Sequence, residues 1–124
     1  MTSSFIIHCQ RIYEPPAADS GLRVLVDRLW PRGVSRERAR IDWWPREIAP
    51  STELRRWFSH DPEHWEEFCQ RYRGELDGRP EQVAELLVRA REAGVVTLLY
   101  AARDAKHNNA LVLRDYLEAH LLGE

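Results

Sequence analysis

The sequence predicts an α/β fold, a small three-layer-like domain with a short, mainly parallel central sheet flanked by helices. Two runs, residues 22–26 and 95–101, have the near-continuous apolar composition of strands that are covered on both faces. A long amphipathic helical pattern and a glycine come directly before the second run, which is the order of an α-then-β unit. We therefore expect the two runs to be parallel neighbours at the centre of the sheet.

The first part of the chain predicts another strand and a connector. Residues 5–13 are rich in β-branched and aromatic side chains, which favour a strand. Residues 14–21 contain prolines and a glycine, which break regular structure. This segment is therefore expected to be a turn-rich connector that leads into the strand at 22–26.

An irregular, arginine-rich segment follows the strand at 22–26. Pro31 and Gly33 do not suit regular structure at its start, and Ser35 can cap a short helical turn that ends at Ala39. Residues 41–45 then predict a short extended piece that contains two adjacent tryptophans. Successive side chains of an extended chain point to opposite faces, so one of these tryptophans is expected to be exposed.

Two helices are predicted in the middle of the chain. Ser51 is a suitable N-cap for a helix that continues to about Phe58. Asp61 and the proline after it suit the N-cap and first turn of the next helix. The apolar positions of that helix repeat at helical spacing until Gly78, which is expected to end it.

The last third of the chain predicts two more helices around a strand. Pro80 begins a helix that Gly94 ends, and the strand at 95–101 follows directly. Asn108 or Asn109 can cap the last helix, whose apolar residues lie on one face.

The composition is typical of one compact domain over residues 1–124. Hydrophobic residues make up 44% and charged residues 31% of the chain, as in globular proteins. The formal net charge of −2 excludes a global electrostatic attraction to nucleic acid or to anionic lipid. No apolar run approaches the roughly 20 residues of a membrane span, so we expect no association with a membrane.

The two cysteines do not indicate a disulfide framework or a zinc site. Cys9 and Cys69 match neither a CxxC motif nor zinc-finger spacing. Both lie among apolar residues and are expected to be buried thiols. Unpaired thiols favour a reducing compartment, so we expect a cytoplasmic protein. We also expect no metal and no other cofactor. Monomer and homodimer both remain open.

Residues 26–33, with the sequence Val-Asp-Arg-Leu-Trp-Pro-Arg-Gly, resemble the signature of the YeaO-like branch of the domain of unknown function 488 family. The resemblance continues over nearly the whole chain, in residues 48–51, 54–58, 60–61, 100–104 and 107–108. It implies a small α/β bacterial cytoplasmic domain and implies no chemistry. Other branches carry a cysteine-containing motif after the last strand, where this chain has Tyr-Ala-Ala-Arg-Asp, so a thiol mechanism is not expected.

Charged loops follow both apolar strands. In open parallel sheets, ligands bind outside the carboxyl ends of the strands, and the ends of parallel neighbours meet at one edge. We therefore expect a site formed by residues of the two loops, which are Asp27, Arg28, Trp30, Arg32, Arg103, Asp104, His107 and Asn108.

Each residue type suggests a role in that site. The guanidinium groups of Arg28, Arg32 and Arg103 can hold a phosphate or carboxylate, and Trp30 can stack on a ring. Trp30 could equally be a core residue, with the arginines paired to surface acids.

His107 is the candidate proton-transfer group, because its ordinary pKa lies near physiological pH. Asp27 and Asp104 are the candidate carboxylates, as a base or as groups that orient the arginines. The spacing of Asp104 and His107 can also resemble a metal pair, but no third ligand has suitable spacing.

Three further residues are candidates for ligand binding. The helix that begins at Ser51 can contribute amides to an anion site, although Ser51 is more simply an N-cap. Of the two arginines of that helix, Arg55 is the one that we expect to reach the site. Tyr100 can offer a hydroxyl at a strand end.

The sequence therefore predicts a small-molecule-binding domain or an enzyme for an anionic ligand that bears phosphate or carboxylate, nucleotides included. One alternative is a nucleic-acid-associated module that uses the basic segment Arg32–Arg40, which the net charge does not favour. Another is a non-catalytic protein-interaction domain that uses an exposed Trp43 or Trp44.

Overall fold

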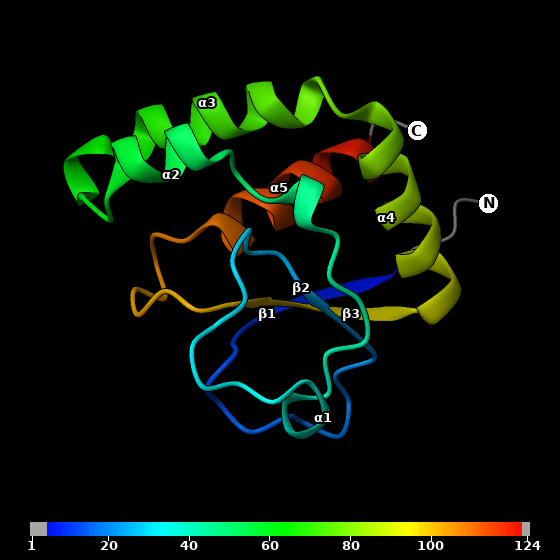
Figure 1. Cartoon of the computed structure of the whole chain (residues 1–124). Helices are drawn as coiled ribbons and strands as arrows, with labels where there is room; N and C mark the ends of the chain where they lie inside the picture. Colours follow the sequence, from blue (N-terminus) through cyan, green and yellow to red (C-terminus); the bar gives the residue numbers. More distant parts are fainter. Residues whose placement is uncertain (1–4, 123–124) are drawn as a thin grey trace.

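The computed structural model describes residues 5–122 and confirms the α/β class. Its strands β1 (Ile6–Arg11), β2 (Leu22–Leu25) and β3 (Val95–Tyr100) form a parallel sheet in the order β1-β3-β2 (Figure 1). β2 and β3 are parallel neighbours, as predicted, but only β3 is central. On its other side β2 has a single parallel bridge, between Val24 and Trp43. The extended segment 41–45, which contains Trp43, protects the edge of β2. This cover explains why β2 is as apolar as a central strand.

The helices begin and end largely where their capping residues predict. The α-helices of the described residues are α1 (Arg36–Ala39), α2 (Thr52–Phe58), α3 (Trp65–Asp77), α4 (Pro80–Ala93) and α5 (Asn109–Leu122). The hydroxyls of Ser35 and Ser51 and the side chain of Asn108 accept hydrogen bonds from the first turns of α1, α2 and α5. Gly94 ends α4 with a φ of 80°.

Two short 3₁₀ helices complete the chain, η1 (Arg46–Ile48) and η2 (Pro62–His64). Asp61 caps η2 rather than α3, because its side chain accepts from the amide of Glu63. The long helix α3 therefore begins only at Trp65, one 3₁₀ turn later than the sequence suggests.

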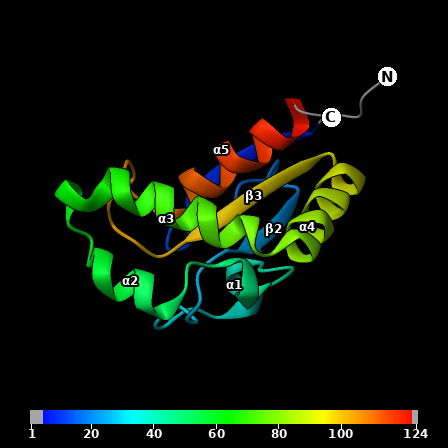
Figure 2. The same cartoon turned by 90° about the horizontal axis from the view of Figure 1, so that it is seen from above.

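The two faces of the sheet are covered unequally. Figures 1 and 2 show α3, α4 and α5 over one face, whereas the one-turn helix α1 and its flanking loops cover the other. Val96, Leu98 and Tyr100 of β3 pack into the helical side, and Leu99 packs into the loop side. A parallel sheet needs cover on both faces, and here loops supply one of the layers.

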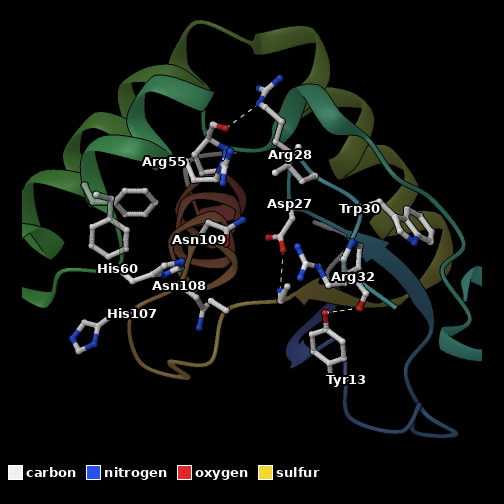
Figure 3. Close-up of a pocket in the computed structure, with 17 residues that line it drawn as sticks. Tyr13, Asp27, Arg28, Trp30, Arg32, Arg55, His60, His107, Asn108 and Asn109 are labelled. Atoms are coloured by element: carbon white, nitrogen blue, oxygen red, sulfur yellow. Dashed lines mark hydrogen bonds between the residues drawn. The ribbon is translucent and has the colours of Figure 1, made fainter. Parts of the chain in front are cut away.

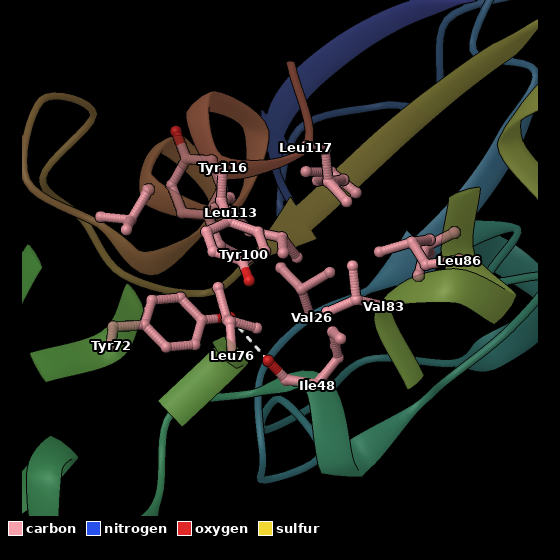
Figure 4. Close-up of a cluster of buried hydrophobic side chains, with 14 of the residues drawn as sticks. Val26, Ile48, Tyr72, Leu76, Val83, Leu86, Tyr100, Leu113, Tyr116 and Leu117 are labelled. Carbon is pink, nitrogen blue, oxygen red and sulfur yellow. Dashed lines mark hydrogen bonds between the residues drawn. The ribbon is translucent and has the colours of Figure 1, made fainter. Parts of the chain in front are cut away.

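The main core lies between the sheet and helices α2 to α5 (Figure 4). Tyr72 of α3 is fully buried in it, and its hydroxyl donates to the carbonyl of Ile48 at 2.6 Å. This bond satisfies a polar group inside the core and fixes η1 against α3. The residues labelled around it are Val26, Leu76, Val83, Leu86, Tyr100, Leu113, Tyr116 and Leu117.

A second, smaller apolar cluster lies under the loop side of the sheet. Its buried residues are Ile12, Leu25, Ala39, Ile41 and Leu99. Trp30 and Trp44 pack against them, with their rings edge to face at 5.2 Å between centroids.

The two adjacent tryptophans point to opposite faces, but neither is exposed. Trp43 packs against the main core, where the guanidinium of Arg89 covers its ring at 4.3 Å, and Trp44 packs into the second cluster. The prediction of an exposed tryptophan is wrong, because loops and arginine stems cover both sides of this segment. Within residues 5–122, no helix has the length and apolarity to cross a membrane.

Gly21 is predicted to be essential for the entry into β2. Its φ is 64°, and a Cβ there would lie 2.1 Å from the carbonyl oxygen of Val95. Gly21→Ala should therefore lower the free energy of unfolding by at least about 2 kcal/mol, measured by urea denaturation. Gly74 of α3 has no neighbouring atom at its Cβ position, so Gly74→Ala should raise it by about 0.5–1 kcal/mol. Equal effects of the two substitutions would contradict this account.

Candidate functional site

The parallel register brings the ends of all three strands to one edge of the sheet. Asp27 lies two residues beyond the end of β2, and its Oδ2 accepts a hydrogen bond from the amide of Ala101 at 2.9 Å (Figure 3). The carbonyl of Asp27 accepts from the indole of Trp44 at 2.8 Å. Asp27 is thus held from both sides, and its carboxylate joins the ends of β2 and β3.

Helix α5 begins at the same edge. Asn108 caps it, and the side chain of Asn108 also donates to the carbonyl of Asp104 at 3.0 Å. The side chain of Asn109 donates to the carbonyl of Val26 at 2.8 Å. The loop after β3 is therefore folded back against the end of β2, and the positive end of a long helix faces the site.

A cavity of about 230 Å³ opens between these elements (Figure 3). Its walls come from the loop after β2, from α2 and the turn after it, and from the start of α5. The residues that line it are Tyr13, Asp27, Arg28, Leu29, Trp30, Pro31, Arg32, Pro50, Arg55, Phe58, His60, Phe68, Ala101, Ala102, His107, Asn108 and Asn109.

Burial raises the pKa of Asp27 above its ordinary value of 3.8. Hydrogen bonds from Ala101 and Asn109 oppose this rise, as do the positive charges of Arg55 and His60. The dominant cause is the removal of the carboxylate from water, which disfavours its charged form. Asp27 is therefore a carboxylate that the fold holds at an energetic cost beside a cavity.

The three arginines of the cavity are not equivalent. Arg28 donates from Nε to the carbonyl of Pro50 at 3.0 Å and from Nη2 to that of Ala49 at 3.2 Å, so its guanidinium is directed toward the backbone (Figure 3). Arg32 and Arg55 form no hydrogen bond or ion pair through their side chains within the described part of the chain. They, rather than Arg28, have free donors for a ligand.

His107 lines the cavity and is oriented by Asp104. The Nδ1 of its ring lies 2.8 Å from Oδ2 of Asp104, and the ring packs edge to face on Trp65 at 5.1 Å between centroids. The amides of Lys106 and His107 donate to the Asp104 carboxylate, and these bonds lower its pKa. This arrangement fixes one ring nitrogen and leaves the other for contact with a ligand.

Several predicted site residues lie outside the cavity. The hydroxyl of Ser51 caps α2 and donates to Glu75. Tyr100 is buried in the main core, where burial raises the pKa of its phenol. Arg103 and Asp104 line an adjacent, more open depression together with Arg11.

The structure adds residues that the sequence did not suggest. Tyr13 follows β1, and its hydroxyl donates to the carbonyl of Arg32 at 2.9 Å. The signal was available, since β1 ends at the same edge as β2 and β3. His60 lies just after the helix that Ser51 begins, and no sequence pattern places it at the cavity.

The two cysteines were expected to be buried thiols, and both are only partly buried. Neither lines the cavity. Burial raises the pKa of Cys9 to about 11 and also raises the pKa of Cys69. Both shifts disfavour the reactive thiolate. Within residues 5–122, no three His, Cys, Asp or Glu side chains are grouped so that they could hold a metal ion.

These features define a small α/β domain with a cavity, lined by both charged and apolar side chains, at the carboxyl edge of a parallel sheet. The chain belongs to the domain of unknown function 488 family, because residues 6–124 match the family model described as the inactive DUF488-N3 subclade. This match confirms the family that the motifs indicated.

The sequences of known proteins align with nearly the whole chain. The "Uncharacterized protein YeaO" of Escherichia coli (strain K12) is 41% identical over 113 residues, which are 91% of this chain and 97% of the relative. The "Uncharacterized protein Rv3073c" of Mycobacterium tuberculosis (strain ATCC 25618 / H37Rv) is 40% identical over 111 residues, 90% of this chain and 92% of the relative. No solved structure has significant similarity to the chain.

Arg28 is predicted to stabilise the fold, whereas Arg32 is not. Arg28→Ala removes the donors to the carbonyls of Ala49 and Pro50 and should lower the free energy of unfolding by about 2 kcal/mol. Arg32 is exposed, and Arg32→Ala should change the free energy of unfolding by no more than about 0.5 kcal/mol. Urea denaturation of both variants tests this difference, and an equal loss in both would contradict it.

Asp27 and Asp104 are predicted to have opposite effects on stability as the pH changes. Folding raises the pKa of Asp27, so the native state loses stability as the pH rises above the ordinary value of 3.8. Asp27→Asn cannot ionise, and its stability relative to the wild type should increase as the pH is raised from about 3 to about 7.

Folding lowers the pKa of Asp104, so Asp104→Asn should become less stable relative to the wild type over the same interval. The free energy of unfolding at each pH is the measurement. If the stability of Asp27→Asn relative to the wild type stays constant or falls as the pH rises, the fold does not hold the Asp27 carboxylate at an energetic cost.

Proposed function

We propose that this protein binds a small anionic ligand in the cavity at the carboxyl edge of the sheet. The observation that carries the proposal is the pair of unengaged guanidinium groups of Arg32 and Arg55 at one cavity. Arginine donors that the protein itself does not use are available for a carboxylate or a phosphate. The start of α5 adds positive character to the same space, and His60 adds a ring that can donate a hydrogen bond.

The size of the cavity supports a small ligand. The cavity volume of about 230 Å³ is small. It is below the usual range for sites that enclose drug-sized molecules. Small organic acids and inorganic phosphate fit this description better than whole nucleotides.

Binding without turnover is our first interpretation, since the matching family model is described as inactive. A second candidate is proton-transfer chemistry, and the observation that favours it is the bond between Asp104 and His107 at 2.8 Å. A carboxylate that orients an imidazole is a common arrangement for an acid or base. Asp27 would then be the second ionisable group of the same cavity.

The alternative of a nucleic-acid surface along Arg32–Arg40 has weaker support. The guanidinium of Arg36 is directed to the carbonyls of Ile41 and Asp42, which removes donors from that segment. The protein-interaction alternative depended on an exposed Trp43 or Trp44, and both are partly buried against the two apolar clusters.

The binding proposal predicts a thermal shift with a panel of phosphate, small carboxylates and nucleotides. A ligand at 100 times its Kd should stabilise the protein by about 2.7 kcal/mol. Arg55→Ala should abolish the shift, because it removes one of the two free guanidinium groups. Arg56→Ala is the matched control, since Arg56 is exposed on the same helix and does not line the cavity.

Two outcomes would count against the proposal. One is a panel in which no anion raises the Tm, while duplex DNA does. The other is a shift that persists in Arg55→Ala and Arg32→Ala, which would place the anion elsewhere on the molecule.

A further inference from the structure

A ligand that carries only negative charge does not match the whole cavity. Asp27 presents a carboxylate to the same space, and within the described residues no basic side chain forms a direct ion pair with it. A carboxylate has about four acceptor positions, and the bonds from Ala101 and Asn109 use two of them. The cavity therefore contains hydrogen-bond acceptors of Asp27 that are not in use, as well as the unengaged guanidinium groups of Arg32 and Arg55.

The opposite charges of the cavity are near one another but separate. Arg55 and His60 are close enough to favour the charged form of Asp27, yet neither forms a hydrogen bond with it. An incoming anion would be attracted by Arg55 and repelled by Asp27. A molecule with a positive and a negative group on neighbouring atoms would satisfy both partners at once.

The backbone around His60 supports its assignment to this cavity. Ser59 and His60 have φ values of 47° and 58°, in the left-handed region that residues other than glycine seldom adopt. This conformation turns the chain sharply after α2 and leaves His60 lining the cavity. Backbone strain of this kind persists where the surrounding structure enforces it, and it is concentrated at functional sites.

Apolar side chains line the remaining wall. Phe58 and Phe68 stack at 4.4 Å between ring centroids, and both line the cavity. At the rim, Leu29 and Tyr13 are exposed to 57% and 46%. This wall suits an uncharged, apolar substituent on the ligand.

We propose that the ligand is a small zwitterionic acid, an α-amino acid with an uncharged side chain, whose ammonium group contacts Asp27 and whose carboxylate contacts Arg55 and His60. The inference rests on the proposed function, because it names the class of anion that the cavity binds. The ammonium has three donors and suits the free acceptors of Asp27. The side chain of the amino acid then lies toward Phe58 and Phe68.

The test compares acids that differ only in the ammonium group. The pairs are glycine with acetate, alanine with propionate, and leucine with 4-methylpentanoate, each titrated into the wild-type protein near neutral pH by calorimetry or by NMR. In at least one pair, the amino acid should bind at least about ten-fold more tightly than its parent acid, as expected for a hydrogen-bonded charge pair.

Two variants locate the ammonium contact. Asp27→Asn keeps an acceptor for the amide of Ala101 but removes the charge, so the preference for the amino acid should fall to about one-fold. Asp19→Asn is the matched control, because Asp19 is exposed in the connector before β2 and does not line this cavity, and it should keep the wild-type preference. The preference of the wild-type protein can be measured even if Asp27→Asn fails to fold.

The outcomes separate this inference from the proposed function. Parent acids that bind as tightly as the amino acids in every pair overturn the zwitterion inference and leave anion binding intact. A preference that survives in Asp27→Asn also overturns it. The absence of binding by every compound of the series, by phosphate and by the nucleotides overturns both proposals.

Discussion

The parallel pairing of β2 with β3 is the constraint on which the site depends. Leu25 pairs with Leu99, and the amide of Val26 donates to the carbonyl of Leu99 at 3.0 Å. This register sets Asp27 opposite Ala101, where its carboxylate accepts the amide at 2.9 Å. A slip of one residue would exchange the two faces of the strand and remove Asp27 from the cavity. The position of the candidate site is thus a consequence of strand register.

The frame around the cavity is held by bonds to backbone carbonyls. Arg28 and Arg79 both donate to the carbonyl of Ala49, and Tyr72 donates to that of Ile48. Residues 48–50 lie at and after the end of the short 3₁₀ helix η1, so these donors satisfy carbonyls that a longer helix or a sheet would otherwise pair. The wall of the cavity that ends at Pro50 is thereby fixed by the fold itself, and a fixed wall would reduce the entropic cost of binding the proposed ligand.

The local elements could be predicted from the sequence because their signals are local. Ser35, Ser51 and Gly94 act within one turn of their own positions, and the apolar runs of β2 and β3 needed only a buried environment. The two charged loops could be placed at one sheet edge because parallel strands end together. The covering of Trp43 and Trp44 could not be predicted, since it depends on Arg89 and on a distant cluster.

The sequence by itself determined the α/β class, the family, the capping of the helices and the edge of the sheet at which polar loops gather. Only the tertiary structure decided which of these polar groups are free. Arg28 is engaged by carbonyls of residues 49 and 50, whereas Arg55 is not engaged, and His60 reaches the cavity through a left-handed turn. Hydrogen-bond partners and side-chain directions depend on segments far apart in the chain, and no local pattern records them.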